Sequence, residues 1–371
     1  MMTLPQPHDE LERLAGLLAE AKALKGVSLG KDAWRRLRRN YAAIASLYFL
    51  IVLGVLAFLT PLLPLQSPIQ PDLDNRQYLP PNTEPVDLGL ASLLGDEESY
   101  ESRVDLLFNN PNGFNRLLIR ARLSIFGDWC VPSICGTNNL GQDLFSRLFW
   151  GARVSLIVGI VATLVSLVIG VSYGATAGYF GGRVDNLMMR IVDVLYSVPF
   201  IFVVILLLTF LNADKVKKAL GEYGIDQIMV FYLVIGAIYW LTMARVVRGQ
   251  VISLKNEQFI EAARTIGAGR ARIIFRHLVP NVLSIVIVYL SLTIPAVMLF
   301  EAFLSFLGLG VSPPDVSWGL LANDSINAMS PLKIYWWIVL FPGVALSSTL
   351  FALNFLGDGL RDALDPRLKN K

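Results

Sequence analysis

The chain has 371 residues and a formal net charge of +3, with 54% hydrophobic and only 16% charged residues. An ordinary globular domain carries about a quarter charged residues, so this composition excludes a typical soluble domain and indicates a membrane protein. The basic residues lie beside apolar runs rather than on one polar face, so we expect no nucleic-acid partner.

Six apolar segments are long enough to cross a membrane, which takes roughly 20 residues. Only helices and closed barrels span lipid, and these segments are too continuously apolar for the alternating strands of a barrel. We therefore predict an all-α membrane protein with six transmembrane helices. The predicted spans are 41–65, 154–178, 194–211, 228–244, 278–300 and 334–357.

Lys and Arg beside the spans indicate the orientation of the chain, because they are retained on the cytoplasmic side. The segment "KDAWRRLRRN" places four arginines directly before the first span, which has no obvious signal cleavage site and should remain as an anchor. We expect residues 1–40, an amphipathic arm with leucines at helical spacing, and the tail 361–371 to be cytoplasmic. The loop 212–227 opposes this assignment, because it is predicted to be external yet holds three lysines.

Residues 66–150 separate the first and second spans and are too many for a structureless connector, so we predict an external insertion there. Cys130 and Cys135 fall in its segment "WCVPSICG". Oxidation is favoured outside the cytoplasm, so we expect a disulfide between them, with two free thiols as the alternative. With no His nearby, metal binding at these cysteines is not expected.

Enzyme signatures are scarce in this sequence. The segment "GVSLGKD" at 26–32 lacks the spacing and the Ser or Thr of a phosphate-binding P-loop. Two histidines are too few for a histidine metal cluster or for most nucleophilic triads. We expect the chain to be neither an enzyme nor a nucleotide hydrolase.

The segment "EQFIEAARTIGAGRARIIFRHLVPN" at 257–281 is a short basic stretch between apolar spans. Its spacing predicts a helix with Phe259, Ala263 and Ile266 on one face. Gly267 suits a left-handed C-cap, and a second helix is predicted after Gly269. The small residues in this helix suit docking into a partner's groove, and an interfacial helix that touches only lipid headgroups is an equal alternative.

This stretch resembles the EAA loop of ABC-importer permeases. Five residues match its pattern in register: Glu261, Ala262, Ala263, Gly267 and Pro280. His277 and Val279 depart from the general pattern. The resemblance implies that residues 256–268, which include Arg264, form a coupling helix that inserts into an ATPase subunit. Arg270 lies just beyond this helix and is expected to take part in the coupling.

Other motifs extend the resemblance to the C-type permeases of the dipeptide, oligopeptide and nickel family. They are "GTNNLGQDLFSRLFWGARVSL", "MRIVDVLYSVPF", "EAFLSFLGLG", "SWGLL" and "RDALDPR". Asn138 stands where that family usually has Asp, and Gln142 where it usually has Arg. The implied fold is that of a type I importer permease, with a five-helix core at 151–360 after the insertion.

The resemblance implies a permease subunit of an ATP-driven importer for peptides or related small solutes, working by alternating access in the bacterial inner membrane. The implied partners are membrane lipid, a second, non-identical permease, two ABC ATPase subunits and an external solute-binding protein. ATP and Mg would bind to the ATPase subunits, and no cofactor to this chain. The alternative is a self-sufficient secondary transporter or channel, which would need intramembrane acids, of which this chain has few.

Several polar or kinking residues lie in or beside the spans. Arg190 and Asp193 are three apart and are expected to pair or to anchor an interface. Pro199 and Pro295, with Pro342, should interrupt helices, as static kinks or as hinges. Glu301, which matches the family motif "ExxLSFLGLG", is expected to have a structural role near the external gate. Glycines at positions 170, 174 and 178 form a stripe that should let two helices approach closely.

Overall fold

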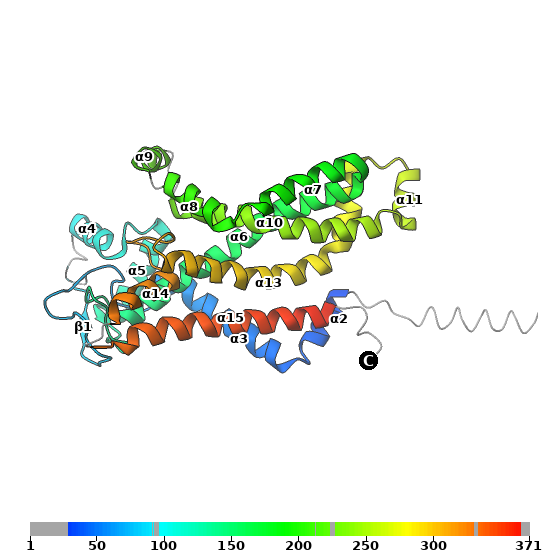
Figure 1. The fold of residues 1–371 in the computed structure, drawn as a ribbon. Coiled ribbons are helices and arrows are strands. Elements are labelled where there is room, and N and C mark those ends of the chain that lie inside the picture. Colours follow the sequence, from blue (N-terminus) through cyan, green and yellow to red (C-terminus); the bar gives the residue numbers. More distant parts are fainter. Residues whose placement is uncertain are drawn as a thin grey trace, which may run out of the picture.

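The computed structural model describes residues 29–364, apart from 91, 93–95, 212, 223–226 and 330–332. The leucine-rich part of the predicted arm and the last seven residues of the tail lie outside the described residues. Long helices run side by side along the molecule (Figure 1). They join one end that carries α4, α14 and β1 to an opposite end that carries α2 and α11.

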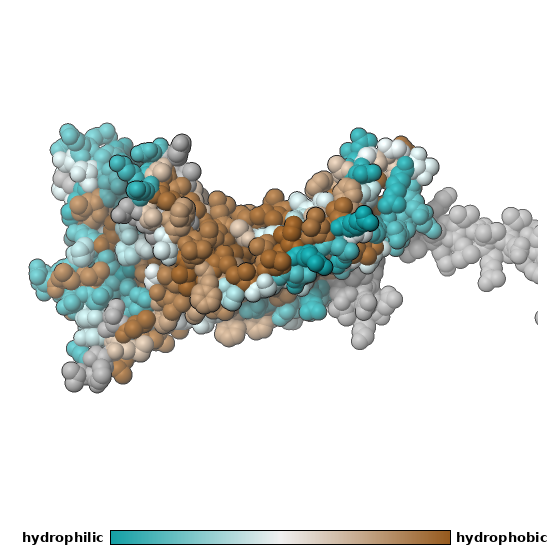
Figure 2. Space-filling view, turned by 45° about the horizontal axis from the view of Figure 1, so that its top comes forward, coloured by the Kyte–Doolittle hydropathy of each residue, from teal (hydrophilic) through white to brown (hydrophobic). Residues whose placement is uncertain are grey.

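Five described helices are long and apolar enough to span a membrane, and a bent pair would make a sixth span. The five are α3 (Tyr41–Phe58), α6 (Leu144–Phe180), α10 (Gln227–Leu254), α13 (Val279–Phe306) and α15 (Trp336–Leu364). The space-filling view shows hydrophobic surface along the middle and hydrophilic surface at both ends (Figure 2). Such a band between polar ends is the pattern expected of a protein that crosses a bilayer.

The remaining elements are short. Between the spans lie the helices α7 (Gly182–Ser197), α8 (Phe200–Leu211), α9 (Asp214–Glu222), α11 (Gln258–Thr265), α12 (Arg270–Arg272) and the π-helix η3 (Ile273–Leu278). Helix α2 (Leu29–Leu37) precedes the first span, and the 3-10 turn η1 (Thr60–Leu62) follows it. The polar end opposite α11 holds β1 (Val86–Asp87), α4 (Glu97–Phe108), α5 (Gly113–Phe126), β2 (Trp129–Cys130) and α14 (Trp318–Ala328).

Prolines shorten the first predicted span and break the third. The first helix stops at Phe58 rather than at residue 65, because Pro61 and Pro64 cannot continue a helix. The third span, predicted as one helix over 194–211, is wrong as a continuous element. Helices α7 and α8 meet at an angle of 81° around Pro199. The residue before this proline, Val198, is extended, as proline sterics favour.

The predicted glycine stripe is confirmed as the contact between α6 and α10. A Cβ built on Gly174 would lie 2.2 Å from the carbonyl oxygen of Ala244. At Gly170 it would lie 2.6 Å from Cβ of Met243. Each distance is below any real Cβ contact, so these positions admit only glycine unless α10 moves. The two helix backbones therefore pack without intervening side chains.

The insertion folds around its own hydrophobic core. Strands β1 and β2 pair antiparallel, and α4 and α5 bury Tyr100, Leu107 and Ile119 against Leu90. Ion pairs between the two helices, such as that of Arg116 with both Glu101 and Asp105 on α4, hold them together.

The expected disulfide is wrong, because Cys130 and Cys135 are both free and buried. Cys130 packs in the core of the insertion. Cys135 packs in a different core, with Trp318 and Trp337. Five residues of sequence separation suggested proximity, but the chain turns the two thiols into separate apolar clusters.

Both thiols should resist alkylation in the folded protein. Burial raises the pKa of Cys130, and raises the pKa of Cys135 to about 12, so neither forms the reactive thiolate at pH 8. We expect maleimide to label no native cysteine until denaturant is added, and then to label two. Ser124→Cys, on the exposed surface of α5, is the control that should react at once. Mass spectrometry that finds a disulfide-linked peptide in non-reduced protein would contradict this assignment.

Candidate functional site

Helix α11 stands at one polar end of the molecule and is anchored by two side chains (Figure 1). Ile260 is fully buried, and Ala263 is 8% exposed. Ile260 belongs to a core that includes Val251 of α10 and Ile273 of η3. The short helix is thereby fixed by tertiary packing, since eight residues would not be a stable helix alone.

Gly267 ends α11 in the way that the sequence predicted. Its φ is +81°, in the left-handed region that favours glycine. The Gly267 N–H donates to the carbonyl of Arg264 (2.9 Å), and the Ala268 N–H donates to the carbonyl of Ala263 (3.0 Å). This pair of bonds is a Schellman C-cap, which turns the chain sharply after the helix.

The outward face of α11 differs from the predicted one. Ala263 points inward with Ile260, three residues earlier, whereas Phe259 and Ile266 are 40% and 87% exposed. Ala262 is exposed between them. The spacing of 259, 262 and 266 fits one helix face, so the outward stripe is centred on Ala262 instead of Ala263. A small residue is therefore flanked by two large apolar side chains that are both exposed.

Charged residues of this segment divide into two groups. Glu261 is exposed in the first turn of α11 and has no ion-pair partner among the described residues. The Arg264 guanidinium lies 5.7 Å from the ring centroid of Tyr179, and that of Arg270 lies 5.7 Å from the ring of Phe180. These cation–π contacts fasten the segment to the last turn of α6. Glu261 is thus left for a partner, while the arginines support the helix.

After the turn at 266–269, the connection from Arg270 to the next span is continuous helix. Gly269 is the N-cap of α12, in agreement with the predicted second helix, and α12 leads directly into η3 and α13. The wider turns of the π-helix η3 lie just before Pro280. In a regular α-helix the ring of this proline would clash with the carbonyl four residues earlier. Because α12, η3 and α13 follow one another without a break, displacement of α12 would be passed to α13.

Asp193 does not pair with Arg190, so the predicted pairing is wrong, whereas Asp193 does anchor a contact between two helices. Its carboxylate oxygen Oδ1 lies 2.6 Å from the Arg245 guanidinium of α10. Nearby, Arg248 donates two hydrogen bonds to Asp185. Helix α7 therefore turns these acids toward α10, while Arg190 remains exposed. Spacing along one helix did not reveal these partners on another.

Glu301 is fully buried in α13 and joins three segments. The Ser305 hydroxyl donates to its Oε1 (2.7 Å), and the Ser155 hydroxyl of α6 donates to its Oε2 (3.4 Å). The same two hydroxyls accept from the backbone N–H groups of Val311 (3.0 Å) and Trp318 (3.2 Å). Glu301 thus ties the segment after α13, and the start of α14, to α6. Pro295 lies within α13 and Pro342 within α15, and whether either acts as a hinge stays a prediction.

Asn138 and Gln142, the two residues that differ from the family's usual Asp and Arg, contact each other. The Asn138 side-chain amide donates to Gln142 Oε1 (3.0 Å), which also accepts from Arg147 (2.5 Å). Arg147 forms a buried ion pair with Asp324 of α14 (3.1 Å). This ion pair was not predicted from the sequence. One signal was available, because Arg147 is a charge just before an apolar span, where a partner is required.

These helices define a multi-pass membrane protein that presents a short capped helix at one polar end. Residues 166–370, more than half of the chain, match the family model described as binding-protein-dependent transport system inner membrane component. Residues 28–81 match the N-terminal TM domain of oligopeptide transport permease C. The chain therefore belongs to the family of binding-protein-dependent transport permeases, has the type I permease fold, and is a membrane transport subunit of an ABC importer.

Relatives cover nearly the whole chain. The dipeptide transport system permease protein DppC of Bacillus subtilis is 39% identical over 94% of this chain and 90% of its own length. The oligopeptide transport system permease protein OppC of Escherichia coli K12 is 40% identical over 94% and 95%. The glutathione transport system permease protein GsiD of Pectobacterium atrosepticum is 33% identical over 92% of both chains. The predicted resemblance to C-type permeases is confirmed.

Proposed function

We propose that the chain imports peptides or related small solutes by alternating access, with α11 as the helix that receives force from an ATPase subunit. The observation that carries this proposal is the outward stripe of Phe259, Ala262 and Ile266 beside the unpaired Glu261. An apolar stripe with a small central residue and a charge at its edge suits insertion into a partner's groove. The peptide cargo is inferred from relatives named for dipeptide, oligopeptide and glutathione transport.

The proposed assembly contains a second, non-identical permease, two ABC ATPase subunits and an external solute-binding protein. ATP and Mg bind to the ATPase subunits, and this chain holds no cofactor. Both termini are cytoplasmic in this proposal, because the arginine-rich α2 lies at the α11 end (Figure 1). The opposite end, with the insertion, then faces outward.

ATP binding would close the ATPase dimer and move α11. The continuous connection through α12 and η3 would pass this movement to α13, and the cation–π contacts of Arg264 and Arg270 would pass it to α6. A partner shifts a conformational equilibrium only by its differential affinity for the two states. The groove of the ATPase must therefore hold α11 differently in the inward-facing and outward-facing transporter.

Cysteine crosslinking tests this assignment with a matched pair inside α11. Ala262→Cys places a thiol on the outward stripe, and Ala263→Cys places one on the inward face. We expect a short bifunctional reagent to join position 262 to an ATPase subunit in the assembled complex, and position 263 to remain unjoined. If position 262 is accessible only to lipid-soluble reagents and never joins a second polypeptide, the interfacial-helix alternative is correct.

A further inference from the structure

Helix α5 of the insertion is apolar on two faces. One face packs into the core of the insertion through the fully buried Ile119. The other face presents Phe114, Leu117 and Ile125, whose side chains are 48%, 62% and 64% exposed, with the half-buried Ala121 between them. Positions 114, 117, 121 and 125 are three or four residues apart, so they share one side of the helix. We call this side the outer face of α5.

The polar residues of α5 lie beside or behind its outer face. Arg116 and Arg120 both form ion pairs with Glu101 on α4. Ser124 is exposed one turn after Arg120 and forms the polar border of the outer face. Basic residues on one side of a helix and an unbroken apolar stripe on another are typical of a helix that lies in the interface of a membrane.

The outer face of α5 continues an exposed apolar stripe on the first span. Tyr48, Ile51, Val55 and Phe58 of α3 are exposed at helical spacing. The ring centroid of Phe58, the last residue of α3, lies 5.4 Å from that of Phe114. The apolar surface that begins on a membrane span therefore passes directly onto α5.

The length of α3 gives the level at which α5 meets the bilayer. Helix α3 has 18 residues, which at 1.5 Å per residue make about 27 Å, slightly less than the hydrocarbon core of about 30 Å. Arginines directly precede its first residue and mark one boundary of that core. Phe58 at its other end, and Phe114 in contact with it, then lie at the opposite boundary between acyl chains and headgroups.

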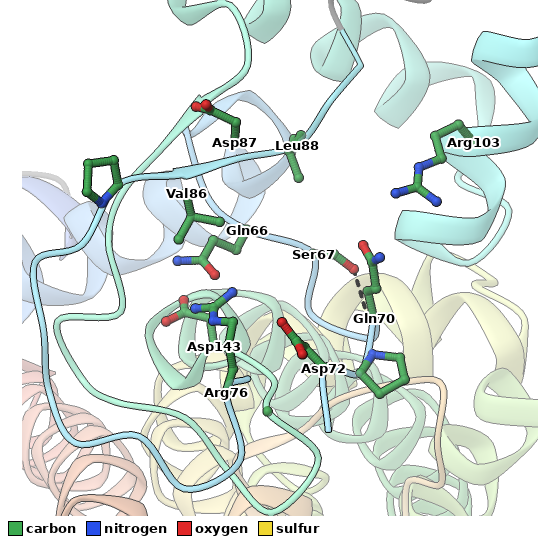
Figure 3. Close-up of a pocket in the computed structure, with 13 residues that line it drawn as sticks. Gln66, Ser67, Gln70, Asp72, Arg76, Val86, Asp87, Leu88, Arg103 and Asp143 are labelled. Carbon is green, nitrogen blue, oxygen red and sulfur yellow. Dashed lines mark hydrogen bonds between the residues drawn. The ribbon is translucent and has the colours of Figure 1, made fainter. Parts of the chain in front are cut away.

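Other parts of the insertion are polar. A cavity of about 430 Å³ lies between the segment after η1, β1, α4 and the start of α6. Its lining includes five charged residues, Asp72, Arg76, Asp87, Arg103 and Asp143 (Figure 3). The outer face of α5 has no charged residue, so the insertion is apolar where it adjoins the first span and polar around this cavity.

We propose that α5 lies in the bilayer interface on the side of the insertion, with its outer face among the lipid acyl chains. A water-soluble receptor fits this face poorly, because the face offers no hydrogen-bonding side chain and would be exposed to water whenever the receptor left. Contacts between transmembrane helices use small and polar residues, whereas this face consists mainly of large apolar ones. Lipid is the partner that needs neither.

Anchoring α5 in this way also fixes the start of a core helix. Arg153 of α6 donates a hydrogen bond to the side-chain oxygen of Asn115 on α5 (3.1 Å). Trp150 of α6 packs against the core of the insertion. Lipid contact at α5 therefore holds the insertion and the first turns of α6 at one level relative to the membrane.

A nitroxide spin label on Leu117→Cys tests the proposal in the complete transporter in lipid nanodiscs, with exposed cysteines of the other subunits replaced. The two native thiols of this chain are buried and should remain unlabelled. We expect the label to collide more often with oxygen than with water-soluble chromium oxalate, and to lie about 5–10 Å into the boundary between headgroups and acyl chains. Val52→Cys, exposed within α3, gives the reference for lipid, and Glu98→Cys, exposed at the start of α4, gives the reference for water.

Each other outcome overturns the proposal. Chromium collisions as frequent as at position 98 would place the outer face in water. A label that neither reagent reaches would show that a protein neighbour covers it. If Leu117→Cys does not assemble, Ile125→Cys on the same face gives the same reading. The measurement needs no ATP hydrolysis, so it can succeed or fail independently of the coupling role of α11.

Leu117→Asp, combined with the label at Ile125→Cys, is a second test. A carboxylate on the outer face favours water over acyl chains, so we expect chromium collisions of the label to rise and oxygen collisions to fall. Leu117→Met keeps the volume and the apolar character of the side chain and is the matched control that should leave both collision rates unchanged. Equal collision rates in the Asp and Met variants would show that the outer face does not contact lipid.

Discussion

Glu261→Lys is expected to abolish ATP-driven uptake while leaving the protein folded. The substitution reverses the exposed charge on the first turn of α11, which no described residue pairs with in an ion pair. A lysine near a helix N-terminus costs only about 0.3–1 kcal/mol through the helix dipole, so folding should survive. Loss of a desolvated charge contact with the ATPase would cost about 2–5 kcal/mol, or more than tenfold in affinity.

The measurement is uptake into reconstituted vesicles together with ATP hydrolysis and complex yield. Lys31→Glu changes the charge by the same amount on α2, at the same end of the molecule but outside α11, and should transport normally. Uptake at the unmodified rate by Glu261→Lys would count decisively against α11 as the coupling helix.

Gly174→Ala is expected to prevent the chain from reaching its assembled, folded state. The added methyl group would lie 2.2 Å from the backbone carbonyl oxygen of Ala244, and backbone cannot rotate away as a flexible side chain can. Overpacking in a well-packed core costs about 1–3 kcal/mol, occasionally more, and here the strain separates α6 from α10. We expect a lower midpoint of thermal unfolding and a low yield of complex.

Gly249→Ala is the matched control for this prediction. Gly249 also lies in α10, but a Cβ there meets no atom within 4 Å. Helix propensity then favours alanine by about 1 kcal/mol, so the control should be neutral or slightly stabilised. Equal stability of the two variants would show that the α6–α10 contact is looser than described.

The sequence was most informative where the structure depends on local rules. The C-cap at Gly267 requires a positive φ, which glycine adopts without steric cost. The residue type alone therefore indicated this cap. The glycine stripe of α6 follows from periodicity, and the apolar spans follow from length and composition. The existence and end of α11 could therefore be predicted without knowing the fold.

Features set by tertiary packing could not be predicted in this way. Ala263 is buried because of the way in which α11 packs against α10 and η3. Asp193 pairs with Arg245 because α7 and α10 are in contact. The two thiols were expected to bond because both lie on the predicted external side, where oxidation is favoured, but tertiary packing buries them in separate cores. The cavity beside Asp143 depends on four distant segments meeting, which no local pattern indicates.

Helix α6 has 37 residues, which at 1.5 Å per residue makes a rod about 55 Å long. Its first turn is capped by Asp143 at the end that carries the insertion, and its last turn carries the two aromatic rings that Arg264 and Arg270 cover. One stiff rod thus joins the insertion to the segment that holds α11. If binding at one end of this rod changes affinity at the other end, reciprocity requires that the second ligand changes the affinity of the first by the same factor.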